Sequence, residues 1–131
     1  MKKSKKIMKD YFISIIVVLD NDSDILGNFV RNTIDVLKSA YENYELVLID
    51  NNSTDKTESL VNKILENEEC IRYIRLSSKY DFEIALSAGL ETVIGDIVIT
   101  LEPQYDPPKI IPSFVKKTIS TGGVVFGIRI N

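Results

Sequence analysis

Apolar residues along this chain fall either in short continuous runs or in stripes at helical spacing. The runs cover residues 12–19, 45–50, 71–76, 97–101 and 124–130 and are rich in Val, Ile and Leu, which predicts five strands. Between the runs, apolar residues recur every three or four positions and predict helices at about 23–40, 55–67, 84–93 and 108–121. Strict alternation of apolar strands with helices is typical of a parallel sheet covered on both faces. The pattern therefore predicts a doubly wound α/β fold.

Local signals mark the ends of these predicted helices. Asp22 or Ser23 is expected to cap the first helix and Asp55 the second, because short polar side chains accept hydrogen bonds from the free N–H groups there. Gly89 is expected to interrupt the third helix. Gly122 is expected to close the fourth, since glycine readily adopts the left-handed conformation found after helices.

The chain has 131 residues, which is long enough for one domain. Its charged residues are distributed unevenly. Five lysines fall within residues 1–10, which we expect to be a basic flexible tail before a domain at 11–131. Without those lysines the chain has 11 basic and 19 acidic residues, a net charge of −8. An acidic body argues against a nucleic-acid partner, which needs a basic face. The tail would either stay solvated or make peripheral contact with anionic lipid.

The residue types present narrow the chemistry further. Histidine is absent, which excludes Ser-His hydrolysis and His-ligated zinc. The single Cys70 excludes an internal disulfide and fits a reducing compartment. No segment approaches the ~20 apolar residues that a membrane span requires. We therefore expect a cytoplasmic location, at the inner face of the membrane if the lysine tail binds lipid.

Acidic side chains follow three of the predicted strands. These acids and their amide neighbours are Asp20, Asp22, Asp50, Asn51, Glu102 and Gln104. The carboxyl ends of parallel strands meet at one edge of a sheet, where open α/β sheets bind ligands. A carboxylate directly after a buried strand, as at Asp50, could accept hydrogen bonds from a nucleobase or a ribose, or stabilise its own turn.

Five segments taken together resemble the family 2 glycosyltransferases of GT-A fold. They are ISIIVVLDND, YELVLIDNNSTDKT, IRLSSKYDFEIALSAGL, GDIVITLEPQYDPPKIIP and VVFGIR, and they span residues 12–130. Within that family they resemble the enzymes that transfer a sugar from a nucleotide to a polyprenyl phosphate, such as dolichol-phosphate mannose synthase and bactoprenol-phosphate glucosyltransferases. The resemblance implies a UDP- or GDP-sugar as ligand and transfer to a polyprenyl phosphate or a glycan acceptor.

The same resemblance assigns roles to particular positions and leaves the catalytic residues unknown. It implies nucleotide binding by Val18, Leu19, Asp20, Asp50, Asn51, Ser53, Ser78 and Lys79. Glu102 and Gln104 stand where the family has an Asp-x-Asp motif that binds Mg²⁺ or Mn²⁺ against the diphosphate. No other cofactor is implied. The family's acceptor-binding half follows the fifth strand, so the chain is expected to be truncated before it.

Several departures from the family pattern fall on the phosphate side of the implied site. Glu102 is longer than the usual Asp, and Gln104 is neutral. Asp81 stands where the family has glycine, and Ser78 replaces an arginine. The connection from Glu102 to Pro107 is one residue shorter than usual. All of these changes are expected to weaken the binding of anions and metal ions.

Two other hypotheses remain beside a domain that binds a nucleotide sugar. The first is a catalytically degenerate interaction protein, which could form a homo-oligomer through the unfinished edge of its sheet. The second is a receiver-like signalling domain, in which Asp20 and Asp22 would bind metal and Asp50 would accept a phosphoryl group. Because Glu102 stands where a receiver has a lysine before Pro103, this second hypothesis is the weaker one.

Overall fold

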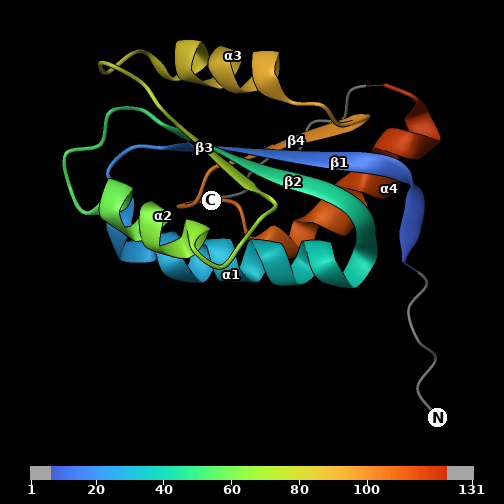
Figure 1. Ribbon diagram of the computed structural model, residues 1–131. Helices are drawn as coiled ribbons and strands as arrows, with labels where there is room; N and C mark the ends of the chain where they lie inside the picture. The colour runs from blue at the N-terminus through green and yellow to red at the C-terminus, as the bar shows by residue number, and fades with distance from the viewer. Residues whose placement is uncertain (1–6, 124–131) are drawn as a thin grey trace.

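The computed structural model describes residues 7–123 of the chain. Within them, strands and helices alternate as predicted (Figure 1). The elements in order are β1 (Met8–Leu19), α1 (Ser23–Ala40), β2 (Tyr41–Asp50), α2 (Thr57–Leu65), β3 (Ile71–Arg75), α3 (Phe82–Thr92), β4 (Ile97–Leu101), the 3₁₀ turn η1 (Pro108–Ile110) and α4 (Ile111–Thr121). The predicted fifth strand, 124–130, lies outside the described residues.

The described strands form one parallel sheet in the order β3-β2-β1-β4. Leu19 lies opposite Asp50, and Asp50 lies opposite Arg75, so three strands end level with one another. Their carboxyl ends therefore share one edge, as the sequence predicts. A receiver sheet has the order 2-1-3-4-5. Since β1 here pairs with β2 and β4, the receiver hypothesis is wrong.

Helices cover both faces of this sheet, but unequally. Figure 1 shows α1, α2 and α4 on one face and α3 on the other. The larger buried cluster lies between the sheet and the group of three helices, and includes Leu26 and Leu37 of α1 and Val115 of α4. The smaller cluster lies under α3 and consists of Ile16, Val18, Val47, Ile49 and Ala85. This arrangement confirms the doubly wound α/β fold.

Helix α3 packs closely on the sheet because Gly89 faces it. A Cβ at this position would lie 2.7 Å from Cγ2 of Ile16, closer than real Cβ atoms approach, and 3.2 Å from Cγ1 of Ile49, which is tighter than most such contacts. The sequence predicts an interruption of the helix at Gly89, and that prediction is wrong, because α3 continues through it to Thr92. Close packing offsets the low helix propensity of glycine here.

The predicted boundaries differ from the observed ones at several other places. Strand β1 begins at Met8 rather than at 12, so the predicted tail of ten residues is too long. Strand β2 begins at Tyr41 rather than at 45. Gly122 ends α4 with φ 67°, which confirms its predicted role. No helix within residues 7–123 is both long enough and apolar enough to cross a membrane.

A buried carboxylate holds the connection between α3 and β4 at the amino-terminal end of the sheet. Glu45 accepts hydrogen bonds from Ser14 Oγ (2.5 Å), Arg72 Nη2 (2.7 Å) and the Ile94 backbone N–H (2.9 Å). Burial raises the pKa of Glu45, but the hydrogen bonds from Ser14, Ile94 and Arg72 outweigh it and hold that pKa below its ordinary value. The carboxylate therefore stabilises the fold in its charged form.

Candidate functional site

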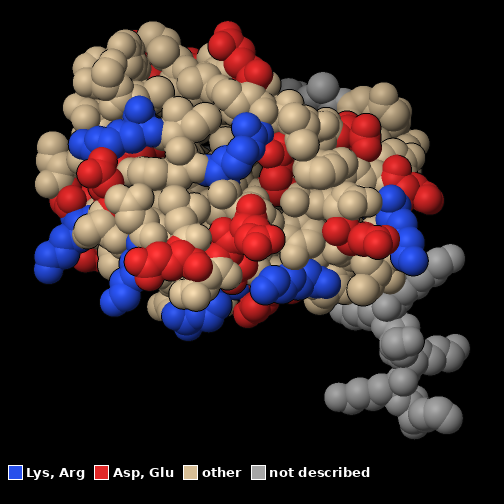
Figure 2. All heavy atoms as spheres, in the orientation of Figure 1, with Lys and Arg blue, Asp and Glu red and all other residues tan. Residues whose placement is uncertain are grey.

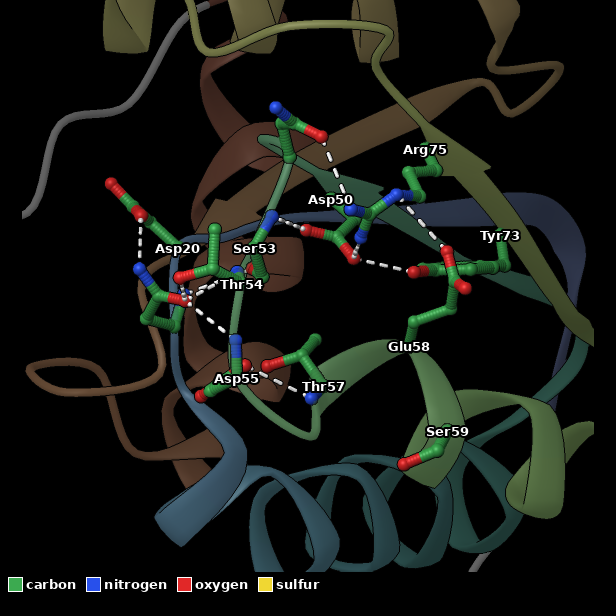
Figure 3. A network of polar contacts seen from close by, with 12 residues as sticks. Asp20, Asp50, Ser53, Thr54, Asp55, Thr57, Glu58, Ser59, Tyr73 and Arg75 are labelled. Carbon is green, nitrogen blue, oxygen red and sulfur yellow. Dashed lines mark hydrogen bonds and ion pairs between the residues drawn. The ribbon is translucent and has the colours of Figure 1, made fainter.

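The turns after β1 and β2 are joined by hydrogen bonds into a single unit (Figure 3). The Asn21 backbone N–H donates to Ser53 Oγ (2.9 Å), and the Asn51 N–H donates to the Leu19 carbonyl (2.8 Å). Asn21 Oδ1 accepts from the backbone N–H groups of Thr54 (2.8 Å) and 55 (3.2 Å). Asn21 has φ 55°, a conformation that asparagine tolerates better than most residues. Neither turn can move without breaking bonds to the other.

Asp50, the last residue of β2, is fully buried, and its carboxylate accepts hydrogen bonds that hold this unit in place. Its Oδ1 accepts from the Ser53 N–H at 2.8 Å. Its Oδ2 accepts from the Tyr73 hydroxyl and from Arg75 Nη1 at 3.1 Å. Burial, followed by the hydrogen bond to Asp50 and its charge, raises the pKa of Tyr73, so the hydroxyl keeps its proton and donates. The carboxylate thus has an evident structural role.

Arg75 extends the network to the helix after β2, as Figure 3 shows. Its guanidinium lies 3.0 Å from Glu58 Oε2 in the first turn of α2 and donates to Asn52 Oδ1 at 3.1 Å. Asn52 also has φ 55°. Because Arg72 bonds to Glu45 beneath α3 and Arg75 bonds toward α2, the two arginines of β3 lie on opposite faces of the sheet.

Asp55 caps the start of two helices at once. Its Oδ1 accepts from the Thr57 N–H (2.9 Å) at the start of α2, and its Oδ2 accepts from the Ser23 N–H (3.1 Å) at the start of α1. Burial raises the pKa of Asp55, but these hydrogen bonds lower it well below the ordinary value. The prediction that Asp55 is the N-cap residue of α2 is wrong in position, because Lys56 occupies the N-cap and makes no side-chain capping hydrogen bond, although the Asp55 carboxylate does accept from the first N–H of the helix.

Asp22, in contrast, does not cap α1 with its side chain. It occupies the N-cap position, yet no side-chain capping hydrogen bond is present. Its Oδ2 accepts from the Asp20 backbone N–H (2.9 Å), and its Oδ1 accepts from the Gln104 amide (3.1 Å). The prediction of a cap at Asp22 is therefore wrong, because the carboxylate turns back toward the loop after β4. There it joins the turn after β1 to that loop.

A hollow of about 450 Å³ opens where the carboxyl ends of β1, β2 and β4 meet the start of α3. Five of the residues predicted to bind nucleotide or metal line it, and they are Val18, Asp20, Asn51, Glu102 and Gln104. Asp22, Asp81 and Pro103 also line it, together with the aromatic residues Tyr80, Phe82 and Tyr105. The structure therefore brings together predicted residues from three separate strand ends.

The other predicted nucleotide-binding residues do not line the hollow. Leu19, Asp50 and Ser53 are buried, Leu19 in the larger hydrophobic cluster and the other two in the network behind the turn. Ser78 and Lys79 lie exposed in the loop before α3. Whether any of the five contacts a nucleotide stays a prediction.

Asn51 fixes the loop before α3. Its Nδ2 donates to the Tyr80 carbonyl (2.8 Å), and its Oδ1 accepts from the Tyr80 N–H (2.9 Å). This pair of bonds ties the loop to the end of β2 and places Tyr80 and Phe82 at the wall of the hollow. Analysis of the sequence did not single out Asn21 or these aromatic residues. The signal for Asn21 was an asparagine in the short polar turn after a buried strand, since asparagine tolerates the left-handed conformation of such turns.

The lining of the hollow is acidic. Asp20, Asp22, Asp81 and Glu102 contribute carboxylates, and no described lining residue is a lysine or an arginine. Lys79 stands beside the hollow and pairs with Asp20, with Nζ 3.1 Å from Oδ1. On the face of residues 7–123 drawn in Figure 2, basic side chains are interspersed with acidic ones rather than gathered into a basic patch.

The predicted metal ligands can be tested against this arrangement. Within the described part of the chain, no three His, Cys, Asp or Glu side chains are grouped so that they could hold a metal ion. Gln104 carries an amide in place of the second carboxylate of the motif, and this amide donates a hydrogen bond to Asp22. Glu102 and Gln104 therefore do not form a metal centre built by the protein alone.

Comparison with known families identifies the domain. The family model described as Glycosyl transferase family 2 matches residues 14–103, which include the strand ends that form the hollow. The chain belongs to glycosyl transferase family 2. This result confirms the resemblance drawn from the five motifs.

Curated relatives of this family 2 chain are considerably longer. It is 34% identical to the undecaprenyl-phosphate 4-deoxy-4-formamido-L-arabinose transferase of Photorhabdus laumondii, over 89% of this chain and 36% of that protein. It is 31% identical to the transferase of the same name from Pseudomonas paraeruginosa, over 95% of this chain and 38% of that protein. The chain thus spans little more than a third of the length of these relatives.

Solved glycosyltransferases share the fold. A mannosyltransferase from Pyrobaculum calidifontis, in complex with GDP-Man and Mn²⁺, superposes with a TM-score of 0.73 at 20% identity, over 82% of this chain and 32% of the other. Glucosyl-3-phosphoglycerate synthase from Mycobacterium tuberculosis, in complex with Mn²⁺ and UDP, gives 0.67 at 19% identity, over 85% of this chain and 40% of the other. At these identities the comparison shows the GT-A fold.

Proposed function

We propose that this chain is the donor-binding part of a family 2 glycosyltransferase and that the hollow holds a nucleoside diphosphate sugar. The observation that carries the proposal is the position of the hollow, where carboxyl ends of parallel strands meet in a family 2 domain. Solved proteins of the same fold were crystallised with GDP-Man or UDP. The open α/β sheet provides the scaffold, and the residues around the hollow provide the contacts.

The residues divide into those that contact the donor and those that hold them in place. Val18 and Asn51 line the hollow at the ends of β1 and β2 and would face the nucleoside. Tyr80 and Phe82 supply aromatic surface on which a base or a ribose could pack. Asp50 and Ser53 would act through the turn that carries Asn51, because their polar atoms are bonded within it.

The acceptor is proposed from the relatives. Two of them are named as transferases for undecaprenyl phosphate, so transfer to a polyprenyl phosphate is the reaction we propose for the whole protein. The contacts to the acceptor and the general base would lie in the remaining two thirds of such a protein. The lysines within residues 1–10 would favour the anionic cytoplasmic leaflet, where polyprenyl phosphates are embedded.

A divalent metal is not assigned to the protein residues. Four carboxylates line the hollow, including that of Asp22, but within residues 7–123 no three acidic side chains are grouped so that they could hold a metal ion. The carboxylate of Asp22 is already bonded to Gln104. No step of the proposal passes through a metal, and binding is therefore to be measured both with and without Mn²⁺.

Calorimetric titration of the full chain with UDP, GDP, UDP-glucose and GDP-mannose tests the proposal. We expect binding of at least one of them with a Kd in the range of about 10 μM to 1 mM, as for a partial site. Phe82→Ala removes an exposed wall of the hollow and should weaken binding about three- to tenfold. Ile84→Ala, on the same helix but outside the hollow, is the matched control. If millimolar concentrations of all four ligands give no heat, this chain is not a donor-binding domain.

A second function is favoured by the exposed apolar side chains around α3 and β4. Leu90 is 49% exposed, Ile94 70% and Val98 37%, and within residues 7–123 α3 packs mainly over β1 and β2 rather than over β4. A degenerate family member could self-associate through this surface. Sedimentation velocity of the wild type and of Val98→Asp checks this. A monomer at all concentrations would leave the donor-binding function standing alone.

A further inference from the structure

The ion pair between Asp20 and Lys79 connects two loops that are far apart in the sequence. Lys79 Nζ lies 3.1 Å from Asp20 Oδ1, which joins the turn after β1 to the loop before α3. Both side chains are accessible, with Lys79 61% exposed and Asp20 43% exposed. Unlike Asp50, neither group is held in place by burial, so each is available to a ligand at the hollow.

The surroundings of this pair make it unusual at a site for a diphosphate. The residues that line the hollow provide four carboxylates and, within the described chain, no basic side chain. The arginines of β3 are bonded elsewhere, Arg72 to Glu45 and Arg75 to Asp50 and Glu58. Lys79 stands beside the hollow and supplies a positive charge there, and its ammonium is already paired with Asp20.

We propose that Asp20 competes with the phosphates of the donor for the ammonium of Lys79, and so sets how tightly the hollow binds anionic ligands. This inference rests on the proposed function of the same hollow. A diphosphate that approaches must take Lys79 away from Asp20 and is then repelled by the carboxylate that Lys79 leaves behind. A neutral nucleoside makes no such demand. Asp20 is thus a specificity-determining residue that disfavours free nucleoside diphosphates.

The expected size of the effect follows from the exposure of the two groups. Exposed ion pairs contribute little to stability, and salt screens them strongly. Removing Asp20 should therefore tighten the binding of UDP or GDP by about two- to fivefold at low salt and by less at physiological ionic strength. The affinity for uridine or guanosine should stay the same, because these nucleosides carry no phosphate.

A double-mutant cycle distinguishes competition from a general charge effect. Asp20→Asn, Lys79→Met and the double variant are titrated with UDP, GDP and the two nucleosides. We expect the gain from Asp20→Asn to be clearly smaller in the Lys79→Met background, because no ammonium has to be released there and only the repulsion by the Asp20 carboxylate remains. Asp81→Asn removes the same charge from another lining residue and is the matched control. Its effect should be the same with and without Lys79.

A measurement without ligand tests the pair itself. The Tyr80 N–H donates to Asn51, so its hydrogen exchange reports the opening of the loop that carries Lys79. Asp20→Asn and Lys79→Met should each speed this exchange about two- to fivefold, and the double variant should do no more. Glu42→Gln, which breaks the exposed pair of Glu42 with Lys9 at the other end of the sheet, is the matched control and should leave it unchanged.

The outcomes separate this inference from the proposed function. If UDP or GDP binds and Asp20→Asn tightens it equally with and without Lys79, or if Tyr80 exchange is unaffected, competition by Asp20 is overturned while donor binding stands. If no protein in the set binds either nucleotide, donor binding fails and the competition fails with it. Binding to Asp20→Asn but not to the wild type would support both.

Discussion

The turns after β1 and β2 differ from the loops after β3 and β4 in how they are held. The first two share bonds between backbone groups and side chains, centred on the buried Ser53 and Asp50 and on Asn21, which is exposed. The loops after β3 and β4 meet the turn after β1 through side chains at the rim, Lys79 with Asp20 and Gln104 with Asp22, and the loop after β3 is also tied to the end of β2, by the bonds between Asn51 and Tyr80. The joined turns after β1 and β2 are therefore fixed by the fold, whereas the side-chain contacts at the rim can rearrange.

This difference indicates what a ligand would find at each end of the hollow. A preformed surface binds without a cost for ordering side chains, whereas exposed ionic contacts must be rearranged first. The end of the hollow near Val18 and Asn51, which we propose takes the nucleoside, is therefore preorganised. The end near Lys79 and Glu102, which we propose takes the phosphates, depends on the ligand to arrange it.

The largest test of this comparison replaces one aspartate in each part. Asp50→Ala removes the acceptor for Ser53, Tyr73 and Arg75 and should lower the free energy of unfolding by about 2–4 kcal/mol. Asp20→Ala breaks an exposed pair and should change it by less than about 0.5 kcal/mol. Urea denaturation of both variants and the wild type gives these values. Equal effects would abolish the distinction between a fixed and an adjustable part.

A second test measures whether a buried, hydrogen-bonded carboxylate outside the site also stabilises the fold. Glu45→Gln, at the other end of the sheet, should lower the free energy of unfolding by about 1–3 kcal/mol at neutral pH. The pKa of Glu45 is lowered on folding, so its carboxylate stabilises the protein above the ordinary value of 4.5 and loses this contribution as the pH falls through the folded pKa.

The measurement for this second test is denaturation as a function of pH. The wild type should lose stability below about pH 4.5, and Glu45→Gln should lose less of it, since the amide does not titrate. Ser14→Ala, which removes one donor to the same carboxylate, should fall between the two. If the two acid limbs run in parallel, Glu45 is not the group responsible.

A third test concerns Asn21. Two variants separate the contribution of its left-handed backbone conformation to stability from the contribution of its side-chain hydrogen bonds. Asn21→Gly keeps the left-handed φ but loses the bonds to the N–H groups of Thr54 and Asp55, and should cost about 0.5–1.5 kcal/mol. Asn21→Ala loses the bonds and also strains the backbone, so it should cost about 1 kcal/mol more. Thermal unfolding of the two variants measures the difference. A glycine variant no more stable than the alanine variant would exclude strain at this position.

Local patterns predicted the strands and helices because alternation and apolar runs are properties of single segments. They could not predict where Asp50 points, since Tyr73 and Arg75 reach it from a neighbouring strand 23 and 25 residues away. The same reason explains Asp22, whose carboxylate bonds to Gln104, 82 residues further on. The bond of Asp55 to the start of α2 was within reach of the sequence, because Thr57 lies two residues away, but its bond to Ser23, 32 residues earlier, was not. Roles that depend on neighbouring strands need the sheet order.

The single helix on one face of the sheet affects how the site would open. Helix α3 is supported by the smaller buried cluster, and its own fully packed residues are Ala85 and Gly89. Elements with little buried apolar surface are the first to unfold locally while the rest of a protein stays folded. Because α3 begins at Phe82, this local unfolding removes a wall of the hollow. A ligand held against Phe82 would oppose it, so occupancy of the hollow and the integrity of α3 are thermodynamically linked.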